Sequence, residues 1–187
     1  MLNEVELGMK AVVGDGRLLV DYALTVRGSL NLITFDGAIG LAHGEYPDLT
    51  RACYISFSGE GTVCLMLTRP PPHPLKDSAR TFIPPVAEVK AGNVRRVGFG
   101  IPLPLRERSE FSPEFAGATY APQSASRIEL RIGCFWRTDE TVLSSLGPPN
   151  VWRAAKGAPL SKIFQVTATA AVLLDVFVRT DAQFIRM

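Results

Sequence analysis

The first 27 residues alternate between apolar and other side chains on both sides of a two-residue turn signal. The apolar positions are Val5, Leu7, Met9, Ala11 and Val13, and then Leu18, Val20, Tyr22, Leu24 and Val26. A period of two is that of a β-strand with one buried face. Asp15 and Gly16 suit the positive φ angles of a type I′ turn. Centring the turn there gives every apolar residue an apolar partner, so the sequence predicts an antiparallel hairpin in this register.

The same period recurs further along the chain. We expect strands at residues 30–35, 54–58, 62–68, 86–89, 94–101, 127–136 and 164–178. The turn Ala91-Gly92-Asn93 predicts that residues 86–89 and 94–101 form a hairpin. The pattern allows one helical turn at 151–156. A helix at 168–178 is the alternative to a strand there, but the β-branched residues of this segment disfavour it. Residues 102–126 and 144–161 are predicted to be long connections.

About eight strands with almost no helical period predict an all-β protein. We expect an antiparallel β-sandwich, immunoglobulin-like in general architecture, with long loops and little helix; a closed β-barrel is the alternative. The turn at 91–93, with strands on both sides and Ile101-Pro102-Leu103-Pro104 after it, resembles hairpins of immunoglobulin-like bacterial β-sandwich domains. The resemblance covers about 20 residues and implies an architecture only. No linker divides the chain, so residues 1–187 are expected to form one sandwich domain.

The charged residues and the cysteines limit the kinds of partner and the cell compartment that we expect. The formal net charge is 20 − 18 = +2, which favours neither nucleic acid nor an anionic membrane as a partner. The N-terminus carries Glu4 and Glu6 where a secretory signal would carry positive charge, so we expect a cytoplasmic protein. The three cysteines, Cys53, Cys64 and Cys134, form no CxxC motif, and we predict buried thiols without a disulfide.

Catalytic and metal-binding signals are weak. The sequence has two histidines, and the metal site that it could build would use His43, Glu45, Asp48 and His73. Two solvated histidines are the simpler interpretation, so we expect no metal and no cofactor. Neither a Gly-x-Ser-x-Gly elbow nor a phosphate-binding glycine motif occurs. An enzyme of unrecognised type, with its site in the 36–50 loop, remains an alternative.

The strongest candidates for binding lie in the two long connections. The candidate residues are Arg106, Arg108, Phe111, Phe115, Tyr120 and Trp152. Long loops on a rigid sandwich often bind partners, although aromatic residues in such loops also pack beneath them. We therefore predict a non-enzymatic module that binds another protein through end loops or an edge strand. A small-ligand or lipid-binding barrel is the alternative.

The strands also indicate how the protein avoids self-association. Unpaired strand edges are commonly protected by charge. The first strand carries Glu4, Glu6 and Lys10, whereas residues 164–174 carry no charge. We expect residues 164–174 to be a central strand of a monomer; pairing with another copy in a homodimer is the alternative.

Overall fold

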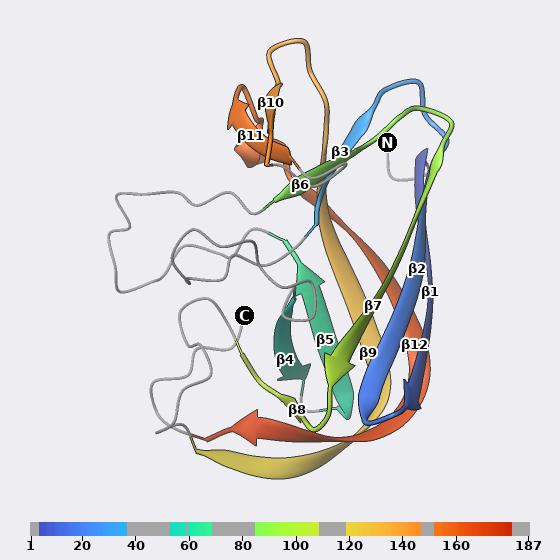
Figure 1. The fold of residues 1–187 in the computed structure, drawn as a ribbon, viewed down its shortest axis with the longest axis vertical. Coiled ribbons are helices and arrows are strands. Elements are labelled where there is room, and N and C mark those ends of the chain that lie inside the picture. Colours follow the sequence, from blue (N-terminus) through green and yellow to red (C-terminus); the bar gives the residue numbers. More distant parts are fainter. Residues whose placement is uncertain are drawn as a thin grey trace.

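Two β-sheets pack against each other, as the sequence predicts (Figure 1). The computed structural model describes residues 4–36, 53–58, 60–68, 85–108, 119–146 and 152–180. Its strands are β1 (Val5–Gly14), β2 (Arg17–Val26), β3 (Leu32–Phe35), β4 (Tyr54–Ser58), β5 (Thr62–Leu67), β6 (Val86–Val89), β7 (Val94–Pro102), β8 (Leu105–Arg106), β9 (Tyr120–Trp136), β10 (Val142–Ser145), β11 (Trp152–Lys156) and β12 (Phe164–Arg179). A short 3-10 turn, Leu160–Lys162, precedes β12.

The smaller sheet has the order β1-β2-β7. The larger has the order β10-β11-β6-β3-β9-β12-β8, and β5 joins it beside β9 with β4 outside β5. Among the described residues no backbone ladder joins the two sheets. The sandwich is therefore confirmed, and the closed barrel expected as its alternative is wrong.

The predicted first hairpin is confirmed residue by residue. Val13 pairs with Leu18, and Val5 at the far end pairs with Val26. Asp15 and Gly16 have φ angles of 52° and 69°, as a type I′ turn requires. The apolar face of β2 lies at the centre of the core that both sheets share. That core includes Leu18, Val20, Leu24, Leu65, Ile128, Leu130 and Ile132.

The predicted hairpin of residues 86–101 is wrong, although both of its strands exist. The turn is formed, with Asn93 N–H donating to the Lys90 carbonyl and Gly92 at φ 76°. However, β6 pairs with β3 in the larger sheet, whereas β7 pairs with β2 in the smaller one. The chain therefore crosses between the sheets at this turn. The burial patterns explain why: β6 is buried on both faces apart from the half-buried Glu88, whereas β7 alternates.

The two predicted connections contain strands. Tyr120–Ser126, predicted as loop, forms the first part of β9, and residues 151–156, predicted to allow a helical turn, contain β11 instead. Two pairings, β5 with β9 and β8 with β12, are parallel and so depart from the expected antiparallel order. Long-range pairing of this kind leaves no local sequence signal.

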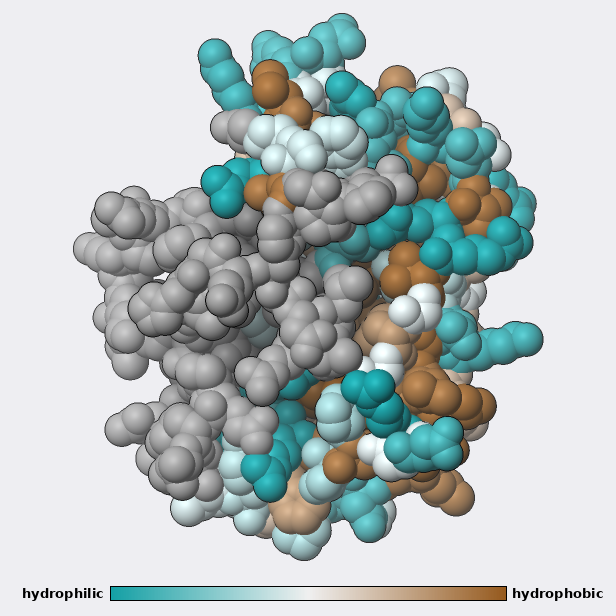
Figure 2. Space-filling view, in the orientation of Figure 1, coloured by the Kyte–Doolittle hydropathy of each residue, from teal (hydrophilic) through white to brown (hydrophobic). Residues whose placement is uncertain are grey.

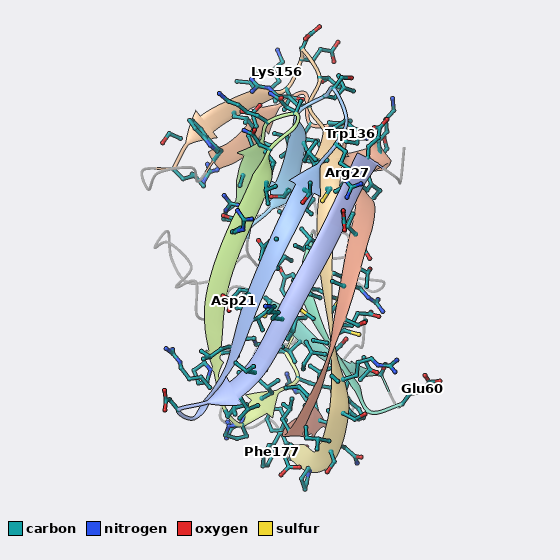
Figure 3. The ribbon with its side chains drawn as sticks, turned by 90° about the vertical axis from the view of Figure 1, so that its right-hand side faces the viewer. Asp21, Arg27, Glu60, Trp136, Lys156 and Phe177 are labelled. Atoms are coloured by element: carbon teal, nitrogen blue, oxygen red, sulfur yellow. The ribbon has the colours of Figure 1, made fainter. Side chains whose placement is uncertain are left out.

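Residues 164–178, which are predicted to be extended, lie within one strand, β12. β12 pairs with β9 along its length, apart from an irregularity between Ala171 and Leu174. On its other side β8 pairs with it only at Val176 and Phe177. The expectation that residues 164–174 form a central strand is therefore wrong for the described residues. Instead, β1 packs closely along β12 and covers it from the smaller sheet (Figure 3).

All three cysteines are free and buried. Cys64 pairs with Ser56, which leaves Cys53 and Cys64 on opposite faces of the β4–β5 hairpin. None of the helical segments described is both long enough and apolar enough to span a bilayer.

The inward and outward positions of β2 predict unequal effects of the same substitution. Leu24 is fully buried and faces the core, whereas Thr25 faces the other side of the sheet. Leu24→Asp should abolish the cooperative unfolding transition, because it buries an unpaired charge. Thr25→Asp should cost no more than about 1 kcal/mol, since it adds only a charge opposite Glu6. Thermal unfolding followed by circular dichroism measures both, and equal losses would contradict the assignment of faces.

Candidate functional site

The sequence-predicted binding residues are divided between the two ends of the sandwich. Arg106 and Tyr120 lie at one end, where β8 and the start of β9 meet the end of β12, and Trp152 on β11 lies at the other (Figure 1). Phe111 and Phe115 are outside the described residues, as are the metal candidates His43, Glu45, Asp48 and His73 and nearly all of the 36–50 loop. In the part of the chain that the structure describes, no three His, Cys, Asp or Glu side chains group as metal ligands do.

Arg106 and Tyr120 come together. The Arg106 guanidinium lies over the Tyr120 ring, 5.5 Å from its centroid, a cation–π contact. Arg106 is exposed, and its backbone pairs with Phe177 of β12. Trp152 is half-buried and packs on a second core cluster that contains Phe35 and Phe135. Trp152 is therefore partly buried, as the sequence allows for aromatic residues in long connections.

Arg108 and its neighbour Glu107 hold strands together. The Arg108 backbone exchanges two hydrogen bonds with Ile55, and its Nε donates to the Cys53 carbonyl (3.1 Å). Glu107 is fully buried. Its carboxylate accepts hydrogen bonds from the backbone N–H groups of Phe57 (2.7 Å) and Arg179 (2.8 Å). Glu107 thus accepts hydrogen bonds from backbone groups of β4 and β12 that none of the described strands reaches. Glu107 and the predicted binding residue Arg108 therefore join strands at this end of the sandwich.

The free edge of β7 is the candidate site that sequence reasoning missed. In an antiparallel pair, alternate residues exchange N–H···O bonds with the residues opposite. Val26 N–H donates to the Asn93 carbonyl (3.0 Å) at one end of the β2–β7 ladder, and Leu103 N–H donates to the Gly16 carbonyl (2.9 Å) beyond the other. Both bonds fall in the same alternate set of the register, so residues 95, 97, 99 and 101 bond to β2.

The backbone groups of residues 94, 96, 98 and 100 therefore point away from β2. None of the described strands pairs with this edge of β7. The nine-residue strand follows β2 without a bulge. It is thus a regular and long template for another extended chain.

Arg95 fixes the position of this edge relative to the larger sheet. Its Nη2 donates to both carboxylate oxygens of Asp36, at 2.7 and 2.8 Å, and Asp36 directly follows β3. Burial raises the pKa of Asp36, and the guanidinium opposes that shift. Burial also raises the pKa of Tyr22, which lies beside this pair. A half-buried ion pair that joins the two sheets thus holds β7 in place.

The inner face of β7 is incompletely covered at the edge. Val97 and Phe99 point inward and pack against the core, yet both remain only partly buried. Phe99 meets the Tyr22 ring edge-on, with 6.5 Å between the centroids. A further strand beside β7 would cover the exposed parts of Val97 and Phe99.

The outer face of the smaller sheet mixes charge and apolar surface. Hydrophilic and hydrophobic side chains are interspersed over β7, β2 and β1 on the right-hand side of the molecule (Figure 2). Figure 3 shows the same sheet face-on, with β7 at one edge and Asp21 beside it. Arg96 and Val94 project from this face of β7, and both are exposed.

Comparisons with protein-family models, curated proteins and solved structures find no match to this chain. The sequence does not reveal the β7 edge, because the turn at 91–93 predicts a hairpin. In that hairpin residues 86–89 would already be the partner of residues 94–101. The signal that could have revealed it is the contrast between the two strands. Residues 86–89 are nearly continuous in apolar character, whereas residues 94–101 alternate.

The buried Glu107 gives a stability prediction for this end of the sandwich. Glu107→Ala leaves the Phe57 and Arg179 amides without their acceptor and should lower the free energy of unfolding by about 2–3 kcal/mol. Glu60→Ala, in the exposed turn before β5, is the matched control and should have almost no effect. Urea denaturation compares the two. A Glu107→Ala midpoint equal to that of Glu60→Ala would show that the carboxylate does not stabilise the fold.

Proposed function

We propose that this protein is a binding module that captures an extended segment of another protein by β-strand addition at β7. The observation that carries the proposal is the row of N–H and C=O groups at residues 94, 96, 98 and 100 that pair with none of the described strands. In strand addition the main-chain hydrogen bonds supply affinity, and alternate side chains supply specificity. Of the two binding modes that the sequence predicts, we therefore prefer binding through an edge strand to binding through end loops.

The opposite edge of the same sheet, strand β1, supports the choice of β7. Arg27 N–H donates to the Glu4 carbonyl, so by the same alternation the outward backbone groups of β1 belong to residues 5, 7, 9, 11 and 13. That edge faces the neighbouring β12, which packs along it. β7 has no such neighbour among the described strands.

The remaining edges of the larger sheet are less suited to strand addition. β10 has four residues, and β4 is already bridged at Ile55 by Arg108. Residues 164–174 of β12 pair only with β9 among the described strands, but β1 packs along their other side. The proposal therefore depends on one strand. We propose in addition that the module is cytoplasmic, because a reducing compartment keeps free thiols such as the three found here reduced. We propose that it is a monomer, because the charges of its first strand protect that edge against pairing with another copy.

Peptide selection tests the proposal without a known partner. A display library of random linear peptides is selected against the immobilised full chain, and enriched peptides are added to the ¹⁵N-labelled protein for hydrogen exchange. A bound peptide should slow the exchange of the Arg96, Gly98 and Gly100 amides, which have no ladder partner. Enriched peptides that leave these amides unchanged, or a library that yields no binder, would overturn the proposal.

Two proline variants complete the test. Arg96→Pro removes an N–H that makes no bond to β2, and Val13→Pro removes the corresponding N–H at the β1 edge. Both should fold, as judged by thermal unfolding. Arg96→Pro should weaken peptide binding about tenfold or more, because it removes a main-chain donor and blocks its neighbours. Val13→Pro should bind like the parent, and equal loss in both variants would contradict binding at β7.

A further inference from the structure

The outer side of the β7 edge carries apolar, positive and negative groups in a fixed order at four positions. Val94 is apolar and 42% exposed, and Arg96, two residues on, is exposed and cationic. Arg96 has no ion-pair partner among the described residues. The next two outward positions are the glycines Gly98 and Gly100, whose own side chains cannot contribute.

Side chains of β2 occupy the space above the two glycines. A β-carbon built on Gly98 would lie 2.5 Å from Oδ1 of Asp21, so this carboxylate leans over β7 toward its free edge. A β-carbon on Gly100 would lie 3.2 Å from Cδ2 of Leu19, which is 38% exposed. The edge thus presents apolar, positive and negative groups at three successive outward positions. At the fourth it presents the apolar Leu19 as the nearest group, with Cδ and Nε of Arg17 each 3.6 Å from the same β-carbon position.

The other charges on this face do not cancel the pattern. Lys10 on β1 lies opposite Asp21 in the register, and Arg17 lies near Gly100. The structure shows an ion pair between Arg27 and Glu6 near the far end of the hairpin, and none between Lys10 and Asp21 within the described residues. The Asp21 carboxylate is therefore available to a strand that arrives beside β7.

We infer that the segment bound at β7 is antiparallel to it and has the alternating order apolar, basic, acidic, apolar on its outward face. This inference rests on the strand addition proposed above. Antiparallel ladders are the more stable kind, and cross-strand pairs of opposite charge are favourable whereas like charges are not. From its N-terminus, the segment places an apolar residue beside Gly100, a base beside Gly98, an acid beside Arg96 and an apolar residue beside Val94.

The inward positions of the segment follow from the same geometry. Its residues opposite Val97 and Phe99 lie over the incompletely covered inner face and are apolar. The bound chain is thus a segment of another protein with the pattern apolar-apolar-basic-apolar-acidic-x-apolar. No segment of this sequence has that order, so neither a second copy nor the chain itself is the expected partner.

Two peptides of identical composition test the order. One contains Val-Ile-Lys-Val-Glu-Thr-Val and the other contains Val-Ile-Glu-Val-Lys-Thr-Val, and each is titrated into the ¹⁵N-labelled protein. The first should bind about tenfold more tightly at low ionic strength, with shifts and protection at residues 94–100, and the preference should shrink in high salt. The double variant Asp21→Lys with Arg96→Glu should reverse the preference. Both exchanged side chains are exposed, and the lysine placed opposite Lys10 should lower the melting temperature slightly without abolishing cooperative unfolding.

The outcomes separate this inference from the function on which it rests. If both peptides protect the Arg96 and Gly98 amides with equal affinity, or if the second binds more tightly, the charge order is overturned while strand addition stands. If neither peptide affects residues 94–100 while library-selected peptides do, the sequence pattern is overturned. If no peptide of either kind acts on these residues, strand addition fails together with the inference.

Discussion

The left-handed pair Asp15 and Gly16 fixes the register on which the smaller sheet depends. With φ angles of 52° and 69°, these residues close a two-residue turn and place Val13 opposite Leu18. A slip of one residue would turn the apolar face of β2 toward solvent. It would also exchange the backbone groups that β2 offers to β7. The register of the turn therefore decides both what the core contains and which groups of β7 stay unpaired.

Two polar contacts, one half-buried and one buried, then hold the sheets and strands in their places. The Arg95–Asp36 ion pair joins β7 to the end of β3, so the unpaired edge has a defined position relative to the larger sheet. Glu107 bonds backbone amides of β4 and β12. Buried polar groups of this kind are costly unless they are fully bonded. The cost of these two contacts indicates that the fold depends on the precise alignment of its strands as well as on the burial of apolar side chains.

Local patterns predicted the strands better than their partners. The Asp15-Gly16 hairpin was predictable because both strands and the turn lie within one short segment. The turn at 91–93 has hairpin chemistry too, but its strands enter different sheets, and only the contrast in their burial patterns hinted at this. The candidate site was accessible to sequence reasoning only as an unspecified edge strand. Asp21 and Leu19 reach the β7 edge because Gly98 and Gly100 have no side chains to block them. This contact depends on the pairing of two strands, which no single segment of the sequence reveals.

Hydrogen exchange of the unliganded protein tests the central claim, that β7 is hydrogen-bonded on one side only. Arg95, Val97, Phe99 and Ile101 bond to β2, whereas Val94, Arg96, Gly98 and Gly100 do not. The first set should therefore exchange slowly and the second set fast, residue by residue along one strand. Uniform protection of residues 94–101 would contradict the account, because it would mean that another segment already occupies this edge.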